Sequence, residues 1–146
     1  MNTAHTSTDP SGRSSGPGRI LIAVYAIFAL AATARAGFQI ATAFEQAPLA
    51  YLLSAFAAVV YIVATVSLAR KGALWFKVAV GAIFVELVGV LVVGSLSLFD
   101  AAAFPRATVW SMYGAGYGFV PLLLPVLGLW WLYRHRTAAV PASTTA

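Results

Sequence analysis

Cysteine is absent from this chain, and charged residues make up only 9% of its 146 positions. Without cysteine there is no disulfide framework, no thiol redox relay and no zinc–thiolate site. Soluble domains are about 25% charged and about 45–50% apolar. Here 61% of the residues are hydrophobic and the mean hydropathy is +0.87. The composition therefore nearly excludes a soluble enzyme and indicates a membrane protein.

Residues that carry catalytic or metal chemistry are also few. The chain has four acidic residues and two histidines, and His5 and His135 lie outside the apolar segments. It contains no Ser–His–Asp set, no HExxH motif and no paired acidic motif. We therefore predict no enzyme activity, no catalytic residue, no metal site and no cofactor. The net charge is +5, but the basic residues form no stripe, so nucleic acid is not an expected partner.

Four long apolar runs occupy most of the chain. Each can cross a hydrocarbon core of about 30 Å as a helix that rises about 1.5 Å per residue. Helices are favoured because a backbone in lipid must satisfy its own hydrogen bonds. We predict an all-α polytopic membrane protein, an antiparallel bundle of four transmembrane helices. The spans are expected at about residues 20–44, 48–69, 75–99 and 113–133.

Polar segments flank this transmembrane domain, which is predicted to cover residues 19–134. Residues 1–18 are rich in Ser, Thr, Gly and Pro, and residues 135–146 are similar. Neither segment can bury enough apolar surface to offset its chain entropy. We expect both segments to be disordered cytoplasmic tails.

The basic residues set the expected orientation. With a cytoplasmic N-terminus, one basic residue, Arg106, lies in an outer loop. Seven then lie on the cytoplasmic side: Arg13, Arg19, Arg70, Lys71, Lys77, Arg134 and Arg136. The positive-inside rule thus predicts a multi-pass protein with both termini in the cytoplasm.

An alternative for the first span is a signal peptide. A signal peptide has a basic residue, a short apolar run and a cleavage site of small residues. These features correspond here to Arg19, the run 20–34 and the small residues that follow it. The long polar leader before Arg19 and the apolar stretch that continues to Phe44 favour an uncleaved span.

Two charged residues lie inside predicted spans. A charge at a helix centre costs about 2.5–3.5 kcal/mol on insertion scales, so each usually faces the protein interior and finds a partner. Arg35 shares a polar stripe with Gln39, and Glu86 lies on a face of small residues in the third span. We predict an intramembrane Arg35–Glu86 pair. Two interpretations stay open: a proton or ion relay that includes Gln39, and a structural clip that fixes helix register.

The fourth span combines glycines and prolines. Gly114 and Gly118 form a GxxxG motif, which permits close approach of another helix. Pro121 and Pro125 are expected to kink the helix and to free the carbonyls of Tyr117 and Pro121 on one face. Gly114, Tyr117, Gly118, Pro121 and Pro125 form our candidate kink and packing face. The alternative is that the freed carbonyls bind a cation or a chain of water molecules.

Two stretches resemble known proteins. ATARAGFQIATAFEQAPLAYLLSAFAAVVYIVATVSLA and TVWSMYGAGYGFVPLLLPVLGLWWL are similar to a family of small integral membrane proteins of actinobacteria. The resemblance covers about residues 20 to 134. It implies a bacterial plasma membrane and a four-helix fold, and it transfers no functional residue. The expected partners are the lipid bilayer and, by helix-mediated association, a homo-oligomer or a membrane complex. The alternative function is a small transporter or channel component that uses the Arg35–Glu86 pair.

Overall fold

The computed structural model describes residues 16–136, and most of both predicted tails lies outside this range. Helices α1 (Pro17–Ala43), α2 (Pro48–Ala69), α3 (Ala73–Phe99) and α4 (Val120–His135) carry the fold. Three short 3-10 helices lie between them: η1 (Phe44–Gln46), η2 (Ala101–Ala103) and η3 (Ser111–Tyr117). There is no strand among the described residues. The predicted all-α bundle is confirmed.

The first three helices follow the predicted apolar runs closely. Pro17 and Pro48 occupy the first turns of α1 and α2, where a missing N–H costs little. Gly72, with φ of 111°, separates α2 from α3. Each of these three helices is long and apolar enough to cross a membrane.

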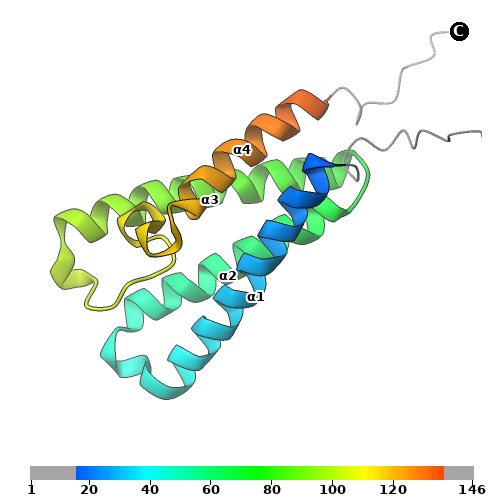
Figure 1. The fold of residues 1–146 in the computed structure, drawn as a ribbon. Coiled ribbons are helices and arrows are strands. Elements are labelled where there is room, and N and C mark those ends of the chain that lie inside the picture. Colours follow the sequence, from blue (N-terminus) through cyan, green and yellow to red (C-terminus); the bar gives the residue numbers. More distant parts are fainter. Residues whose placement is uncertain (1–15, 137–146) are drawn as a thin grey trace, which may run out of the picture.

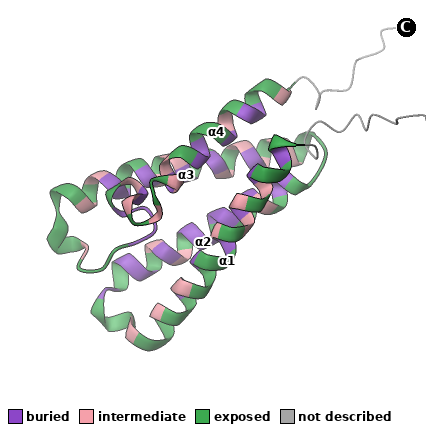
Figure 2. Ribbon diagram, viewed as in Figure 1, coloured by how far each residue is buried: buried purple, intermediate pink, exposed green. Residues whose placement is uncertain are grey.

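The helices pack in sequence order, α1 on α2, α2 on α3 and α3 on α4, whereas α1 and α4 make little contact. We call the end with Pro17, the α2–α3 turn and His135 the proximal end, and the end with η1 and η2 the distal end. The α1–α2 and α3–α4 pairs diverge toward the distal end, and the chain between η2 and α4 lies between them (Figure 1). Buried residues follow the facing sides of the helices (Figure 2).

The fourth span is not the continuous helix that the sequence predicted. Helix α4 begins at Val120, and η3 meets it at an angle of 100°. The break comes from left-handed backbone at Met112, Tyr113, Gly114, Gly118 and Phe119. Two of these five are glycines, which adopt positive φ at no steric cost. We call residues 104–119 the re-entrant segment, because they turn back into the bundle.

Irregular backbone at membrane depth has to be buried in protein and hydrogen-bonded. The re-entrant segment meets this demand locally. Thr108 N donates to Ser111 Oγ at 2.8 Å, and Trp110 N donates to Thr108 Oγ1 at 3.1 Å. The backbone of Ser111 in turn donates to Thr108 O at 3.3 Å. Thr108 and Ser111 thus replace the bonds that a helix would supply.

Small residues form the contact between α1 and α2. Ala29, Ala32 and Ala36 of α1 are buried, as are Ala57 and Ala64 of α2. Small side chains allow helix backbones to approach closely, which is how helices gain packing energy when lipid replaces water. This tight pair forms the wall against which the re-entrant segment lies.

Candidate functional site

Glu86 lies at the centre of α3, thirteen residues from each end of the helix, and is fully buried. Its Oε2 accepts a 2.7 Å hydrogen bond from the Tyr25 hydroxyl on α1. Its Oε1 has no hydrogen-bond partner among the described residues. Gly128 on α4 lies beside the same phenol, because a Cβ there would be 3.4 Å from Tyr25 Oη. The buried Glu86 of α3 is thus hydrogen-bonded to α1 at a point where α4 also lies close.

The predicted Arg35–Glu86 pair is not formed. Arg35 donates to the Tyr117 hydroxyl in η3 and, at 3.1 Å, to the Ala107 carbonyl oxygen. Its guanidinium carbon lies 5.7 Å from the centre of the Tyr117 ring. The reason is distance along the helix: Tyr25, the residue that reaches Glu86, lies ten residues and about 15 Å before Arg35 on α1. Arg35 instead meets the re-entrant segment, whose inward turn the sequence did not predict.

Gln39, the third member of the predicted charge site, lies one turn beyond Arg35. Its Oε1 is buried and has no hydrogen-bond partner within residues 16–136. No hydrogen bond joins Gln39 to Glu86 or Arg35 in this part of the chain. The three residues therefore do not form one relay.

Trp110 anchors the re-entrant segment inside the bundle. Its side chain is 1% exposed, and its Nε1 donates to the Tyr61 hydroxyl on α2 at 3.1 Å. Its ring lies against Gly89, where a Cβ would come within 2.5 Å of ring carbon Cζ3. Gly89 follows Glu86 by three residues. The indole therefore reaches almost to the level of the buried acid.

The small-residue face of α3 receives the re-entrant segment elsewhere too. A Cβ on Gly94 would lie 2.5 Å from the Tyr113 ring, and Ser95 Oγ lies 2.9 Å from the Tyr113 hydroxyl. Ser97 Oγ accepts a 2.7 Å bond from Met112 N. The distal half of α3 is therefore covered by the re-entrant segment of its own chain.

The predicted kink and packing face is rearranged in the same way. Gly114 has φ of 80° and packs against the Pro121 ring, so the GxxxG motif of Gly114 and Gly118 lies in a turn, outside α4. Pro121 stands in the first turn of α4 and does not kink it. The Tyr117 carbonyl therefore lies before α4 and is not freed by a kink. Of the two prolines, Pro125 alone lies inside the helix.

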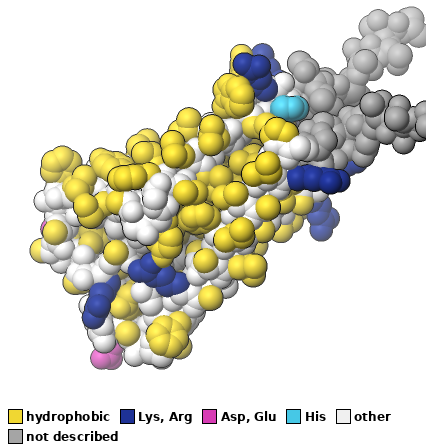
Figure 3. All heavy atoms as spheres, in the orientation of Figure 1, with side chains coloured by type: hydrophobic (Ala, Val, Ile, Leu, Met, Phe, Trp, Pro, Cys, Tyr) yellow, Lys and Arg dark blue, Asp and Glu magenta, His cyan; other side chains and the backbone are white. Residues whose placement is uncertain are grey.

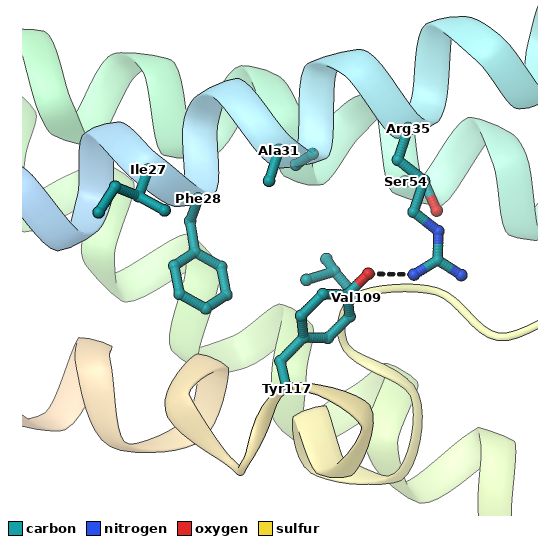
Figure 4. A pocket seen from close by; sticks show the side chains of 8 residues that line it. Ile27, Phe28, Ala31, Arg35, Ser54, Val109 and Tyr117 are labelled. Carbon is teal, nitrogen blue, oxygen red and sulfur yellow. Dashed lines mark hydrogen bonds between the residues drawn. The ribbon is translucent and has the colours of Figure 1, made fainter.

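A cavity of about 120 Å³ lies between α1 and the re-entrant segment. Figure 4 shows Ile27, Phe28, Ala31 and Arg35 of α1 facing Tyr117 and Val109 across it. We call it the distal cavity. An apolar groove of about 280 Å³ lies between the proximal halves of α1 and α4, lined by residues that include Leu21, Val24, Leu124 and Leu127. The groove lies where α1 and α4 make little contact with each other.

The described residues contain no group of three or more His, Asp or Glu side chains that could hold a metal ion. Glu86 lines neither the distal cavity nor the α1–α4 groove. The arrangement is suited to packing and to binding apolar or anionic groups.

Sequence reasoning missed Tyr25 and the inward position of Trp110. Tyr25 had a detectable signal, because it continues the row of Leu21, Ala29, Ala32 and Ala36 at helical spacing. A tyrosine within such a buried row needs a partner for its hydroxyl. Trp110 had no such signal, since its burial depends on left-handed turns several residues away.

Comparison of the chain with protein-family models, with curated proteins and with solved structures gives no match. These comparisons do not test the resemblance to small actinobacterial membrane proteins, which stays a prediction.

Proposed function

We propose that this chain is a non-enzymatic integral membrane protein of the bacterial plasma membrane that acts by helix-mediated self-association. Its long apolar helices are compatible with a multi-pass membrane protein. The surface that we assign to association is the outward face of α1. This choice follows from where the chain leaves small side chains uncovered.

The main support for this proposal is an exposed row of small residues on α1. Thr33, Gly37 and Ala41 follow one another at intervals of four and are all exposed. A Cβ at Gly37 would meet nothing within 4 Å, so packing within the chain gives no reason for glycine there. Rows of small residues at this spacing let two transmembrane backbones approach closely.

A second copy of the chain is the partner that fits this row best. Two parallel α1 helices related by a two-fold axis would present the same three small residues to each other. Arg35 is directed toward Tyr117 and Ala107, so pairing through this face buries no unpaired charge. In contrast, Gly114 of η3 and the mid-helix Gly89 of α3 are covered by their own chain, by Pro121 and by Trp110 respectively.

The transporter alternative has weaker support. It relied on an Arg35–Glu86 pair, and these residues have different partners. Glu86 is also fully buried. We therefore do not propose it.

The test is a pair of glycine substitutions. Gly37→Leu is expected to abolish energy transfer between donor- and acceptor-labelled copies in liposomes, because leucine holds the two backbones apart. Gly81→Leu is the matched control, since Gly81 lies in α3 and a Cβ there also meets nothing within 4 Å. Equal transfer for Gly37→Leu and the unsubstituted chain would refute the proposal, as would equal loss in both variants.

A further inference from the structure

Among the residues that the structure describes, Arg35 lies in the apolar run of α1 and has no acidic partner. Within residues 16–136 its hydrogen bonds go to the Tyr117 hydroxyl and the Ala107 carbonyl oxygen, both uncharged. A guanidinium has five N–H donors, so these two bonds leave donors for a further ligand. A neutral phenol and a peptide carbonyl do not neutralise the charge. Arg35 is therefore an unmatched cation within an apolar bundle.

The depth of Arg35 suits a contact at the membrane surface. Helix α1 has 27 residues and is about 40 Å long, so it extends about 5 Å beyond each side of a hydrocarbon core of about 30 Å. Arg35 lies eight residues, or about 12 Å, before Ala43. Its Cα is then about 7 Å inside the distal boundary of the core. A long arginine side chain spans such a depth while its head reaches polar groups at the interface.

The space beside Arg35 is apolar. The distal cavity has Phe28 and Val109 on its walls and the exposed residues Ile27 and Ala31 at its rim. An apolar cavity of about 150 Å³ stays dry and binds molecules such as benzene. At about 120 Å³ the distal cavity is of similar size. Hydrophobic side chains cover much of the face of the molecule shown in Figure 3, which also carries arginine or lysine side chains.

We propose that the distal cavity binds an anionic phospholipid from the adjoining leaflet. The phosphate lies against the Arg35 guanidinium, which is suited to phosphate because its planar fork can donate two parallel hydrogen bonds. The first part of an acyl chain fills the cavity between α1 and the re-entrant segment. The positive charge of Arg35 and the apolar lining of the cavity together favour this ligand. A free anion would leave the cavity unfilled, and an uncharged lipid would leave the charge of Arg35 without a counter-charge.

This lipid site is independent of the proposed self-association. The three small residues of the association face lie on the outward side of α1, whereas Arg35 is directed at Tyr117. Gly37→Leu is therefore expected to keep the bound lipid. Failure of either proposal leaves the other standing.

The experiment uses the full chain reconstituted in phosphatidylcholine nanodiscs with and without phosphatidylglycerol. Native mass spectrometry then counts the phosphatidylglycerol retained after extraction into detergent. Arg35→Gln is expected to lower this retention about tenfold, as follows from the loss of a charge-assisted contact. The matched control is Arg106→Gln, because Arg106 also lies at the distal end and bonds to Gln46 Oε1 at 3.3 Å. Its retention is expected to stay within about twofold of the unsubstituted chain.

Two further arms separate the parts of the proposal. Ala31→Phe fills the cavity and keeps Arg35, so it is also expected to lower retention. Inorganic phosphate is expected neither to bind alone nor to displace the lipid. If Arg35→Gln does not fold, as judged by tryptophan fluorescence, Ala31→Phe and Arg35→Lys carry the test, with Lys expected to lower retention because it lacks the fork.

Several results would overturn the lipid site. These are full retention by Arg35→Gln or, where that variant does not fold, by Arg35→Lys; equal loss in Arg35→Gln and Arg106→Gln; full retention by Ala31→Phe; and displacement of the lipid by inorganic phosphate.

Discussion

The Tyr25 hydroxyl on α1 donates a 2.7 Å hydrogen bond to Glu86 at the centre of α3. This bond joins the first and third helices at mid-depth, where water cannot replace a lost partner. It accounts for the buried acid without Arg35. Glu86 therefore acts in the fold as a link between helices, with a phenol as its partner.

Tyr25→Phe is expected to lower the free energy of unfolding by about 1–3 kcal/mol, because it removes a bond to a buried carboxyl group. Unfolding in mixed micelles with increasing denaturing detergent measures the change. The double variant Tyr25→Phe with Glu86→Leu is expected to be more stable than Tyr25→Phe alone, since no polar group is then left unpaired. A Tyr25→Phe variant as stable as the unsubstituted chain would contradict this role of the bond.

Gly89→Ala is expected to lower the free energy of unfolding by about 1–3 kcal/mol through overpacking. The added Cβ would lie 2.5–2.9 Å from three carbons of the Trp110 ring. A shift in tryptophan emission and earlier thermal unfolding are the measurements. Gly81→Ala is the control, because a Cβ there meets nothing within 4 Å. Similar losses at both glycines would show that Trp110 does not lie against Gly89.

Gly114→Ala tests the re-entrant turn. Gly114 combines φ of 80° with a Cβ position 2.7 Å from the Pro121 ring, so alanine brings both backbone strain and a steric clash. We expect a loss of about 1–3 kcal/mol in the free energy of unfolding. Gly116, two residues further along, has open space around it and no positive φ, so Gly116→Ala should change the free energy of unfolding by less than about 1 kcal/mol. If η3 and α4 formed one straight helix, both substitutions would stabilise it.

Single cysteines can test the topology because the natural chain has none. Glu45→Cys lies at the distal end and Lys71→Cys at the proximal end, and both positions are exposed. The positive-inside rule predicts that an impermeant maleimide added to intact cells labels position 45 and spares position 71. The reverse pattern would invert the orientation, and labelling of both would refute the α2 span.

Apolar length accounts for the success of sequence reasoning on α1, α2 and α3. A run such as Pro48–Ala69 carries no charge and has a proline at its start and a basic turn at its end, so it specifies one helix locally. The fourth run met the same criterion of length and hydropathy, yet glycines and prolines divide it into η3 and α4. Hydropathy depends on residue type and carries no information about backbone angles. The bend between η3 and α4 was therefore not predicted.

The partners of the two charged residues inside the apolar runs could not be predicted from the sequence. The sequence by itself predicted a cysteine-free, all-α chain with helices apolar enough to cross a membrane. It also identified Arg35 and Glu86 as charges inside apolar runs that need partners, because the cost of burying a charge depends on residue type and depth. Which partners they take was decided by the tertiary structure. The inward turn of residues 104–119 brings Tyr117 to Arg35 and Trp110 to Gly89, and the packing of α1 brings Tyr25 to Glu86. Such pairings depend on left-handed turns and helix rotation, which are set by packing across the whole bundle and not by any local pattern.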